Sequence, residues 1–300
     1  MVPRALAALT LAATLLAASP AAAAERTDAE GVSSRMTLRV RPDGTIDVTE
    51  DVTFRFAGHT TGLERDLDWE ADDGVLVDGI RVSEGETAYR DGGSRKPGTG
   101  VPGTYAVDGS NRYEGIELTW HFDATDETRT FRFSYRMRRQ TVAYADTAEI
   151  DLVLFSSFRM RTGIDRLDAT VILPGAPARD RFRTWLYPVQ GRPDPVAELR
   201  GSRVEVSVPA VDTDTRAGQS GQLVALHLLF PRSLLTSTAG ARTSTEAAFD
   251  RIVREQEEGI QAAGPGSPLQ FLGPFILFGF GVNLVTWLVR RVRRRPRPSP

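Results

Sequence analysis

Residues 46–56 read Ile-Asp-Val-Thr-Glu-Asp-Val-Thr-Phe-Arg-Phe, and this stretch decides the fold class. Every second residue is apolar except Glu50, and the residues between them are polar or charged. A period of two is typical of a β-strand with one buried and one solvated face. The preceding Arg41-Pro42-Asp43-Gly44 is a turn signal. Residues 36–56 therefore predict a β-hairpin whose second strand is half-buried.

The same period returns along the chain as far as residue 230. Short alternating or apolar runs, separated by Gly, Pro and Asp, occur at Val75–Val82, Ile116–Phe122, Phe131–Met137, Ile150–Phe155, Ala169–Leu173, Trp185–Tyr187, Val204–Val208 and Leu223–Phe230. Many short strands favour a mainly β fold. We expect an antiparallel β-sandwich of one or two units, with a first β unit over 33–160 and a second over 161–235.

A helical pattern follows the β region. Thr243-x-x-Glu246 matches a capping box, and Phe249, Ile252 and Val253 begin a partial apolar stripe. A Gly- and Pro-rich hinge, residues 264–268, comes next. These features predict a short juxtamembrane helix over 243–262.

Residues 1–24 have the pattern of a secretory signal peptide. Arg4 precedes an Ala- and Leu-rich run, and Ala22-Ala23-Ala24 supplies small residues at the cleavage position. The alternative is an uncleaved N-terminal anchor, for which the run is short and rich in alanine.

Residues 269–289 form a second apolar segment near the C-terminus. They contain no charged residue, and at about 1.5 Å per residue they match the ~30 Å hydrocarbon core of a bilayer. Six arginines follow in the tail 290–300, and positive charge remains on the cytoplasmic side. We predict a single transmembrane helix, a cytoplasmic C-terminus and an extracytoplasmic N-terminal region, with the lipid bilayer as a partner. A buried core helix is the alternative.

Charge and composition exclude several function classes. All 39 acidic residues and 30 of the 37 basic residues lie within 25–268, so the exported part has a net charge of −9. An acidic region of this kind is not expected to bind nucleic acid. The chain has no cysteine and three histidines, which excludes disulfides and thiolate chemistry. We expect neither a metal site nor a cofactor.

Glu50 and Arg65 are the first candidate site residues. Each occupies an apolar-face position of an alternating run, Arg65 between Leu63 and Leu67. Because an unpaired buried charge is costly, the two side chains are expected to pair. One interpretation is a structural ion pair between neighbouring strands. The other is a catalytic carboxylic acid positioned by an arginine.

Two charged segments each have a functional interpretation and an alternative in which the side chains are simply exposed to solvent. Arg132, Arg136 and Arg138 form a basic stripe on the outer face of one strand. The stripe either docks an anionic partner, such as a lipid headgroup, an envelope protein or a wall polymer, or pairs with neighbouring acidic residues. The acidic loop Asp68 to Asp73 resembles a Ca²⁺ loop in composition only, so a solvated turn is the alternative.

An ordered set of motifs also resembles a known family. The set comprises Val48-Thr49-Glu50, Phe56-Ala57-Gly58, Arg65-Asp66-Leu67, Phe133-Ser134-Tyr135, Asp146 with Glu149, and Leu173-Pro174. Over roughly residues 33–232 it is similar to the exported region of bacterial predicted membrane proteins of the domain-of-unknown-function 2207 family. The chain departs from the family at Ile150-Asp151-Leu152, where a Trp often follows. The resemblance implies an envelope location and an architecture, and it implies no particular reaction.

Two functional hypotheses follow. The first is a membrane-tethered binding or scaffolding module of the cell envelope, which fits the lack of a nucleophile motif. The second is an envelope enzyme that acts on a glycan or lipid-linked substrate, with Glu50 or Glu149 as acid and base.

Overall fold

A computed structural model of the 300-residue chain describes residues 28–67, 74–108, 116–156, 163–187, 196–211 and 223–263. The predicted signal peptide, the acidic loop Asp68 to Asp73, the predicted membrane helix and the arginine tail lie outside these residues. Within the described ranges, no helix is long and apolar enough to cross a membrane.

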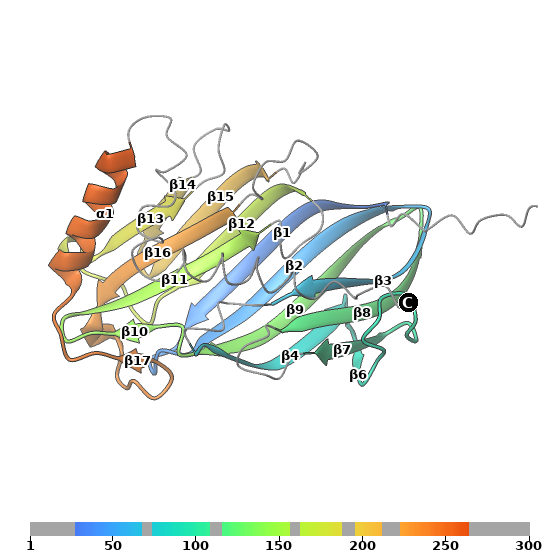
Figure 1. Cartoon of the computed structure of the whole chain (residues 1–300), viewed down its shortest axis with the longest axis horizontal. Coiled ribbons are helices and arrows are strands. Elements are labelled where there is room, and N and C mark those ends of the chain that lie inside the picture. Colours follow the sequence, from blue (N-terminus) through green and yellow to red (C-terminus); the bar gives the residue numbers. More distant parts are fainter. Residues whose placement is uncertain are drawn as a thin grey trace, which may run out of the picture.

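Three sheets make up the β structure (Figure 1). The largest has eight strands, in the order β14 (Val196–Arg200), β15 (Arg203–Val211), β12 (Ile164–Ile172), β1 (Asp28–Val40), β2 (Ile46–Ala57), β9 (Thr128–Arg138), β4 (Leu76–Glu84) and β5 (Thr87–Ala88). The second has five strands, β13 (Arg183–Tyr187), β16 (Leu223–Pro231), β11 (Thr147–Ser156), β10 (Val142–Ala143) and β17 (Arg242–Thr243). The third has four strands, β3 (His59–Asp66), β8 (Glu117–Thr125), β7 (Thr104–Asp108) and β6 (Arg90–Asp91).

The hairpin predicted from residues 36–56 is present as β1 and β2. Val40 pairs with Ile46, and Gly44 turns the chain with a φ of 86°, a left-handed value that glycine adopts without a steric penalty. Along β2, buried residues alternate with partly or fully exposed ones, as the sequence pattern predicts. The mainly β prediction is thus confirmed.

Most strand pairs are antiparallel, as expected, but the sheets are mixed, because β1 pairs in parallel with β12. Met36 lies beside Ala169 in that ladder, while its other neighbour is Glu50 of β2. Side-chain alternation reports which face a residue occupies and carries no information on strand direction. The parallel ladder also places strands from both expected ranges, 33–160 and 161–235, in the eight-stranded sheet.

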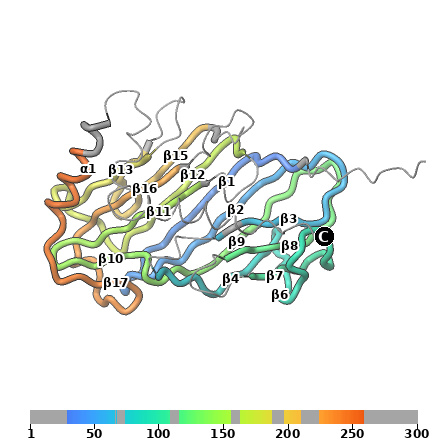
Figure 2. Tube along the Cα trace, in the orientation of Figure 1, coloured from blue at the N-terminus to red at the C-terminus, as the bar shows by residue number. Residues whose placement is uncertain are grey.

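The sheets enclose one hydrophobic core. The smaller sheets lie over different parts of the large sheet, with β8 over the β2–β9 region and β11 and β16 toward β12 and β15 (Figures 1 and 2). Trp120 of β8 contacts Phe54 of β2 and Phe133 of β9, at ring-centroid distances of 6.3 and 4.9 Å. Aromatic side chains contribute large apolar areas, so they dominate this contact between layers.

Helix α1 (Phe249–Ala263) packs on the face of the five-stranded sheet that points away from this core. Phe249 and Ile252 join Leu229 of β16 in a second apolar cluster. The helix begins at Phe249 rather than at residue 243, because Thr243 belongs to β17 and pairs with Ala143 of β10. The predicted capping box is therefore wrong.

Candidate functional site

The structure brings Glu50 and Arg65 together across the two layers. Glu50 is on the inner face of β2, and Arg65 comes from β3 in the four-stranded sheet. Arg65 Nη1 donates a hydrogen bond to Glu50 Oε2 at 2.8 Å, and the Ser34 hydroxyl donates to Oε1 at 2.9 Å. Both carboxylate oxygens of Glu50 are therefore occupied.

The pair is almost closed to solvent. The Glu50 side chain is 2% exposed and that of Arg65 is 10% exposed. The guanidinium carbon of Arg65 also lies 5.0 Å from the ring centroid of Phe133, a cation–π distance. A carboxylate held in this way has no exposed oxygen to present to a substrate.

The three arginines of the predicted stripe lie on the outer face of the eight-stranded sheet, each beside a carboxylate. Arg132 binds Asp51 through two hydrogen bonds of 2.6 and 2.9 Å, and Arg136 binds Asp47 at 3.0 Å. Arg138 lies 2.7 Å from Asp78. All three side chains are about half exposed, and such pairs contribute little to stability.

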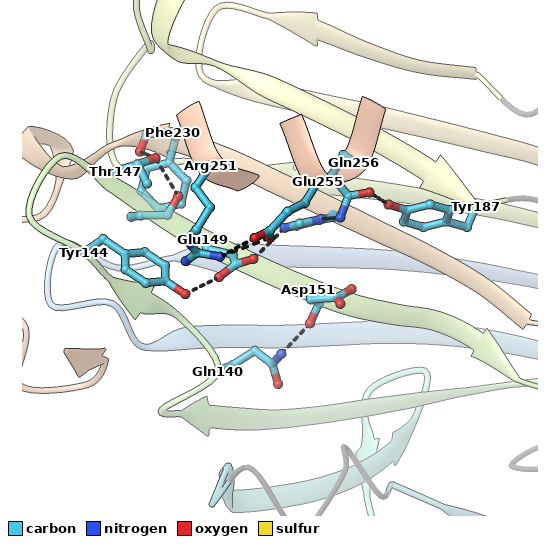
Figure 3. Close-up of polar contacts among 12 residues, drawn as sticks. Gln140, Tyr144, Thr147, Glu149, Asp151, Tyr187, Phe230, Arg251, Glu255 and Gln256 are labelled. Atoms are coloured by element: carbon cyan, nitrogen blue, oxygen red, sulfur yellow. Dashed lines mark hydrogen bonds and ion pairs between the residues drawn. The ribbon is translucent and has the colours of Figure 1, made fainter. Parts of the chain in front are cut away.

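A buried polar network that the sequence did not reveal joins α1 to the five-stranded sheet (Figure 3). Glu149 of β11 accepts hydrogen bonds from His227 Nε2 at 2.8 Å and from the Tyr144 hydroxyl at 2.9 Å. Gln256 of α1 continues the network, with its Nε2 3.1 Å from His227 Nδ1 and its Oε1 accepting from the Tyr187 hydroxyl. The network thus links three strands (β11, β13 and β16), the loop that carries Tyr144 and helix α1 around the His227 imidazole.

Electrostatics favour the charged forms of His227 and Glu149. Burial lowers the pKa of His227, but the hydrogen bond to Glu149 and the charges of Asp151 and Glu149 outweigh burial and raise the pKa above its usual value. Burial likewise raises the pKa of Glu149, and His227, Tyr144 and Arg242 together bring it below its usual value. The Gln256 amide, as oriented, suits a singly protonated ring; a second proton requires the amide to turn so that its oxygen accepts.

The first turn of α1 is held by Asp146, from the loop between β10 and β11. Its carboxylate accepts hydrogen bonds from the backbone N–H groups of Ala248 at 2.8 Å and Phe249 at 3.3 Å. Burial raises the pKa of Asp146, but these two N–H groups, the backbone N–H of Asp146 itself and the charge of Arg181 together outweigh burial and keep the pKa below its usual value. A carboxylate at this position also complements the positive end of the helix dipole.

Two polar residues in apolar patterns were the available sequence signal for this network. His227 stands within the apolar strand Leu223–Phe230, and Gln256 lies on the apolar stripe of α1 at helical spacing from Ile252. Each pattern shows a polar side chain on a buried face. Neither shows that the two faces meet, because 29 residues separate them.

The described residues contain no group of three or more His, Asp or Glu side chains arranged to hold a metal ion. The one loop with a calcium-like composition lies outside those residues.

The fold and these contacts define a mainly β module of mixed sheets, to which helix α1 is fastened by buried polar groups. The family model for the N-terminal domain of a predicted membrane protein (DUF2207) matches residues 33–219, and the chain belongs to this family. A search of curated proteins found no match.

Several solved structures are similar at low identity. One is a Legionella pneumophila protein titled a "putative nutrient binding protein", with 11% identity, a TM-score of 0.38 and 66% of each chain covered. Another is an M1 zinc metallopeptidase from Deinococcus radiodurans, with 11% identity and a TM-score of 0.34; the match covers 68% of this chain and 42% of that one. The chain thus spans about two fifths of the peptidase. At these scores, the similarities carry no argument about a site or an activity.

Proposed function

We propose that this protein is a membrane-anchored extracytoplasmic module of the cell envelope that binds or scaffolds other envelope components. A signal peptide would export the β-sandwich, and the apolar segment 269–289 would anchor it with the arginine tail in the cytoplasm. The membership of a family of predicted membrane proteins supports this arrangement.

The observation that carries the proposal is the double attachment of α1. In the sequence the helix precedes the predicted membrane segment, and it is fixed to the β structure at its start by Asp146 and farther along by Gln256. Both Asp146 and Glu149, the partner of His227, belong to the motif set that resembles the family. A helix fastened in this way fixes the place on the β-domain from which the chain continues, through the hinge 264–268, to the predicted membrane segment.

No observation favours the enzyme alternative. Glu50 is enclosed by Ser34 and Arg65, and both oxygens of Glu149 accept hydrogen bonds from protein groups. Neither carboxylate is placed to exchange a proton with a substrate.

Reporter fusions to the full chain test the proposed topology. A reporter that is active only outside the cytoplasm should be active when inserted at Gly201, in the turn between β14 and β15, and inactive when fused after Pro300. The reverse pattern, or activity at both sites, would contradict the proposal. In vivo cross-linking from the outer face of the sandwich should then trap a discrete envelope component.

A further inference from the structure

A cleft opens at the end of the sandwich where α1 begins. It has a volume of about 670 Å³ and is lined by parts of three segments, 145–146, 176–181 and 231–234. This volume lies within the roughly 300–1,000 Å³ of small-molecule sites. Ala176, Ala178, Pro231 and Leu234 supply an apolar wall, and alanine side chains leave the space open.

Two arginines supply the cationic groups of this cleft, and both have donors to spare. Arg181 uses only Nη2, which lies 3.3 Å from Asp146 Oδ2 and 3.4 Å from the Asp146 carbonyl oxygen. Arg232 donates from Nη1 to the Leu235 carbonyl at 3.0 Å. Across the part of the chain that the structure describes, neither guanidinium makes another hydrogen bond to protein. A guanidinium carries five N–H donors, so each can still bind an oxyanion.

The local charge is opposite in sign to that of the exported region as a whole. The residues that line the cleft include two cations, Arg181 and Arg232, and one carboxylate, Asp146, so the lining has a net positive charge. Residues 25–268 have a net charge of −9. A positive concave site on an acidic domain favours an anionic ligand by charge complementarity.

We propose that this cleft binds a small molecule that carries a carboxylate on an apolar body. The carboxylate would take the planar donor forks of Arg181 and Arg232, and the apolar body would cover Ala176, Ala178 and Leu234. The inference rests on the proposed binding function and specifies its ligand class.

Arg181 also connects the cleft to α1. Its guanidinium carbon lies 4.4 Å from the ring centroid of Phe249, the first residue of the helix, and its other partner is Asp146, which caps that helix. A ligand carboxylate bound through the free donors of Arg181 would draw the guanidinium away from both contacts. Occupation of the cleft would thus weaken the hold on the first turn of α1, on the path toward the membrane segment.

The ligand class can be tested with the full-length protein in detergent micelles. The chain has no cysteine, so A176C introduces a single thiol in the cleft. N-acetylalanine should slow alkylation of this thiol several-fold, and the neutral N-acetylalaninamide should not. Equal protection by acid and amide, or protection by methyl phosphate alone, would overturn the carboxylate assignment.

Two variants and a matched control place the interaction at the arginines. In the A176C background, R181Q and R232Q should each raise the N-acetylalanine concentration needed for half-maximal protection at least tenfold. R179Q should leave that concentration unchanged, because exposed Arg179 does not line the cleft. R232Q keeps the proposal testable if R181Q unfolds α1. Loss of protection in R179Q alone would refute the site.

The link to α1 has its own readout. N-acetylalanine should increase amide hydrogen exchange in the first turn of α1, around Phe249, and leave β2 unchanged. Unchanged amide hydrogen exchange around Phe249 at an N-acetylalanine concentration that fully protects the thiol would refute the link. None of these results depends on topology, so failure of the ligand proposal is distinguishable from failure of the reporter fusions.

Discussion

Replacing one member of the Glu50–Arg65 pair should destabilise the sandwich far more than breaking an exposed pair on the same strand. E50Q keeps the shape of the side chain and removes the counter-charge of Arg65, whose Nε already lacks an acceptor among the described residues. R65M leaves the Glu50 carboxylate with the Ser34 hydroxyl as its remaining partner.

The size of the expected loss of stability follows from the burial of both side chains. Both side chains are at most 10% exposed, so either single change leaves a charge that water cannot reach, at a cost of about 3–5 kcal/mol. For a folded unit of this size, each 1 kcal/mol lowers the melting temperature by about 2–4 °C, so we expect a decrease of roughly 6–20 °C. The double variant E50Q/R65M should cost less than the sum, because its second change removes the uncompensated charge.

Thermal unfolding of the full-length protein in micelles, followed by near-ultraviolet circular dichroism, measures these shifts. D51N is the matched control: Asp51 is the next residue on β2, faces the other way, and pairs with the half-exposed Arg132. Its cost should stay within about 1 kcal/mol. If E50Q or R65M has the same melting temperature as D51N, the reasoning about a buried pair is wrong. A variant that keeps wild-type stability but loses ligand binding would instead indicate that the pair belongs to an open site.

Three further predictions concern other parts of the molecule. The pKa of His227 is raised in the folded protein, so its contribution to stability is fully present below about pH 6.5 and is lost as the pH rises through the pKa of the folded state. The pKa of Glu149 is lowered, so its contribution to stability is present above about pH 4.3. The loss of melting temperature in H227Q should accordingly be larger at pH 5.5 than at pH 9, and equal losses would contradict the pairing. G100A should destabilise by about 1–3 kcal/mol and loosen the loop around it in hydrogen exchange, since an added Cβ would lie 2.2 Å from His121 Cδ2; G100A/H121A should cost less than the two single changes combined. Replacing Arg132, Arg136 and Arg138 together by Gln should leave co-sedimentation of the protein with phosphatidylglycerol vesicles unchanged, because each arginine already pairs with a carboxylate. A loss of vesicle binding that depends on salt concentration would show that the stripe docks anions.

The local features of the fold were accessible from sequence. The alternation of apolar and polar residues along β2 predicted which face of the strand is buried. Glu50 lies on that face, so a partner of opposite charge was expected. Arg65 was identifiable as that partner because it also occupied an apolar-face position nearby in the chain. The prediction of a pair between neighbouring strands missed that β2 and β3 lie in different sheets. Apart from the β1–β2 hairpin, β2 pairs with β9 and β3 pairs with β8, and no local pattern specifies these two pairings.

The start of α1 shows a second limit. Thr243 and Glu246 match a capping box, yet Thr243 pairs with Ala143 and the cap comes from Asp146, about a hundred residues earlier. A local capping motif competes with every donor and acceptor that the tertiary fold supplies.

The sequence by itself determined strand periodicity, the faces of Glu50 and Arg65, and the existence of a helix after the β region, because each depends on side-chain spacing within one segment. Only the tertiary structure decided the parallel ladder of β1 and β12, the layer arrangement, and the meeting of Glu149, His227 and Gln256. These features arise where segments far apart in the chain exclude water together. Burial then makes each polar group depend on a partner that its own neighbourhood in the sequence does not contain.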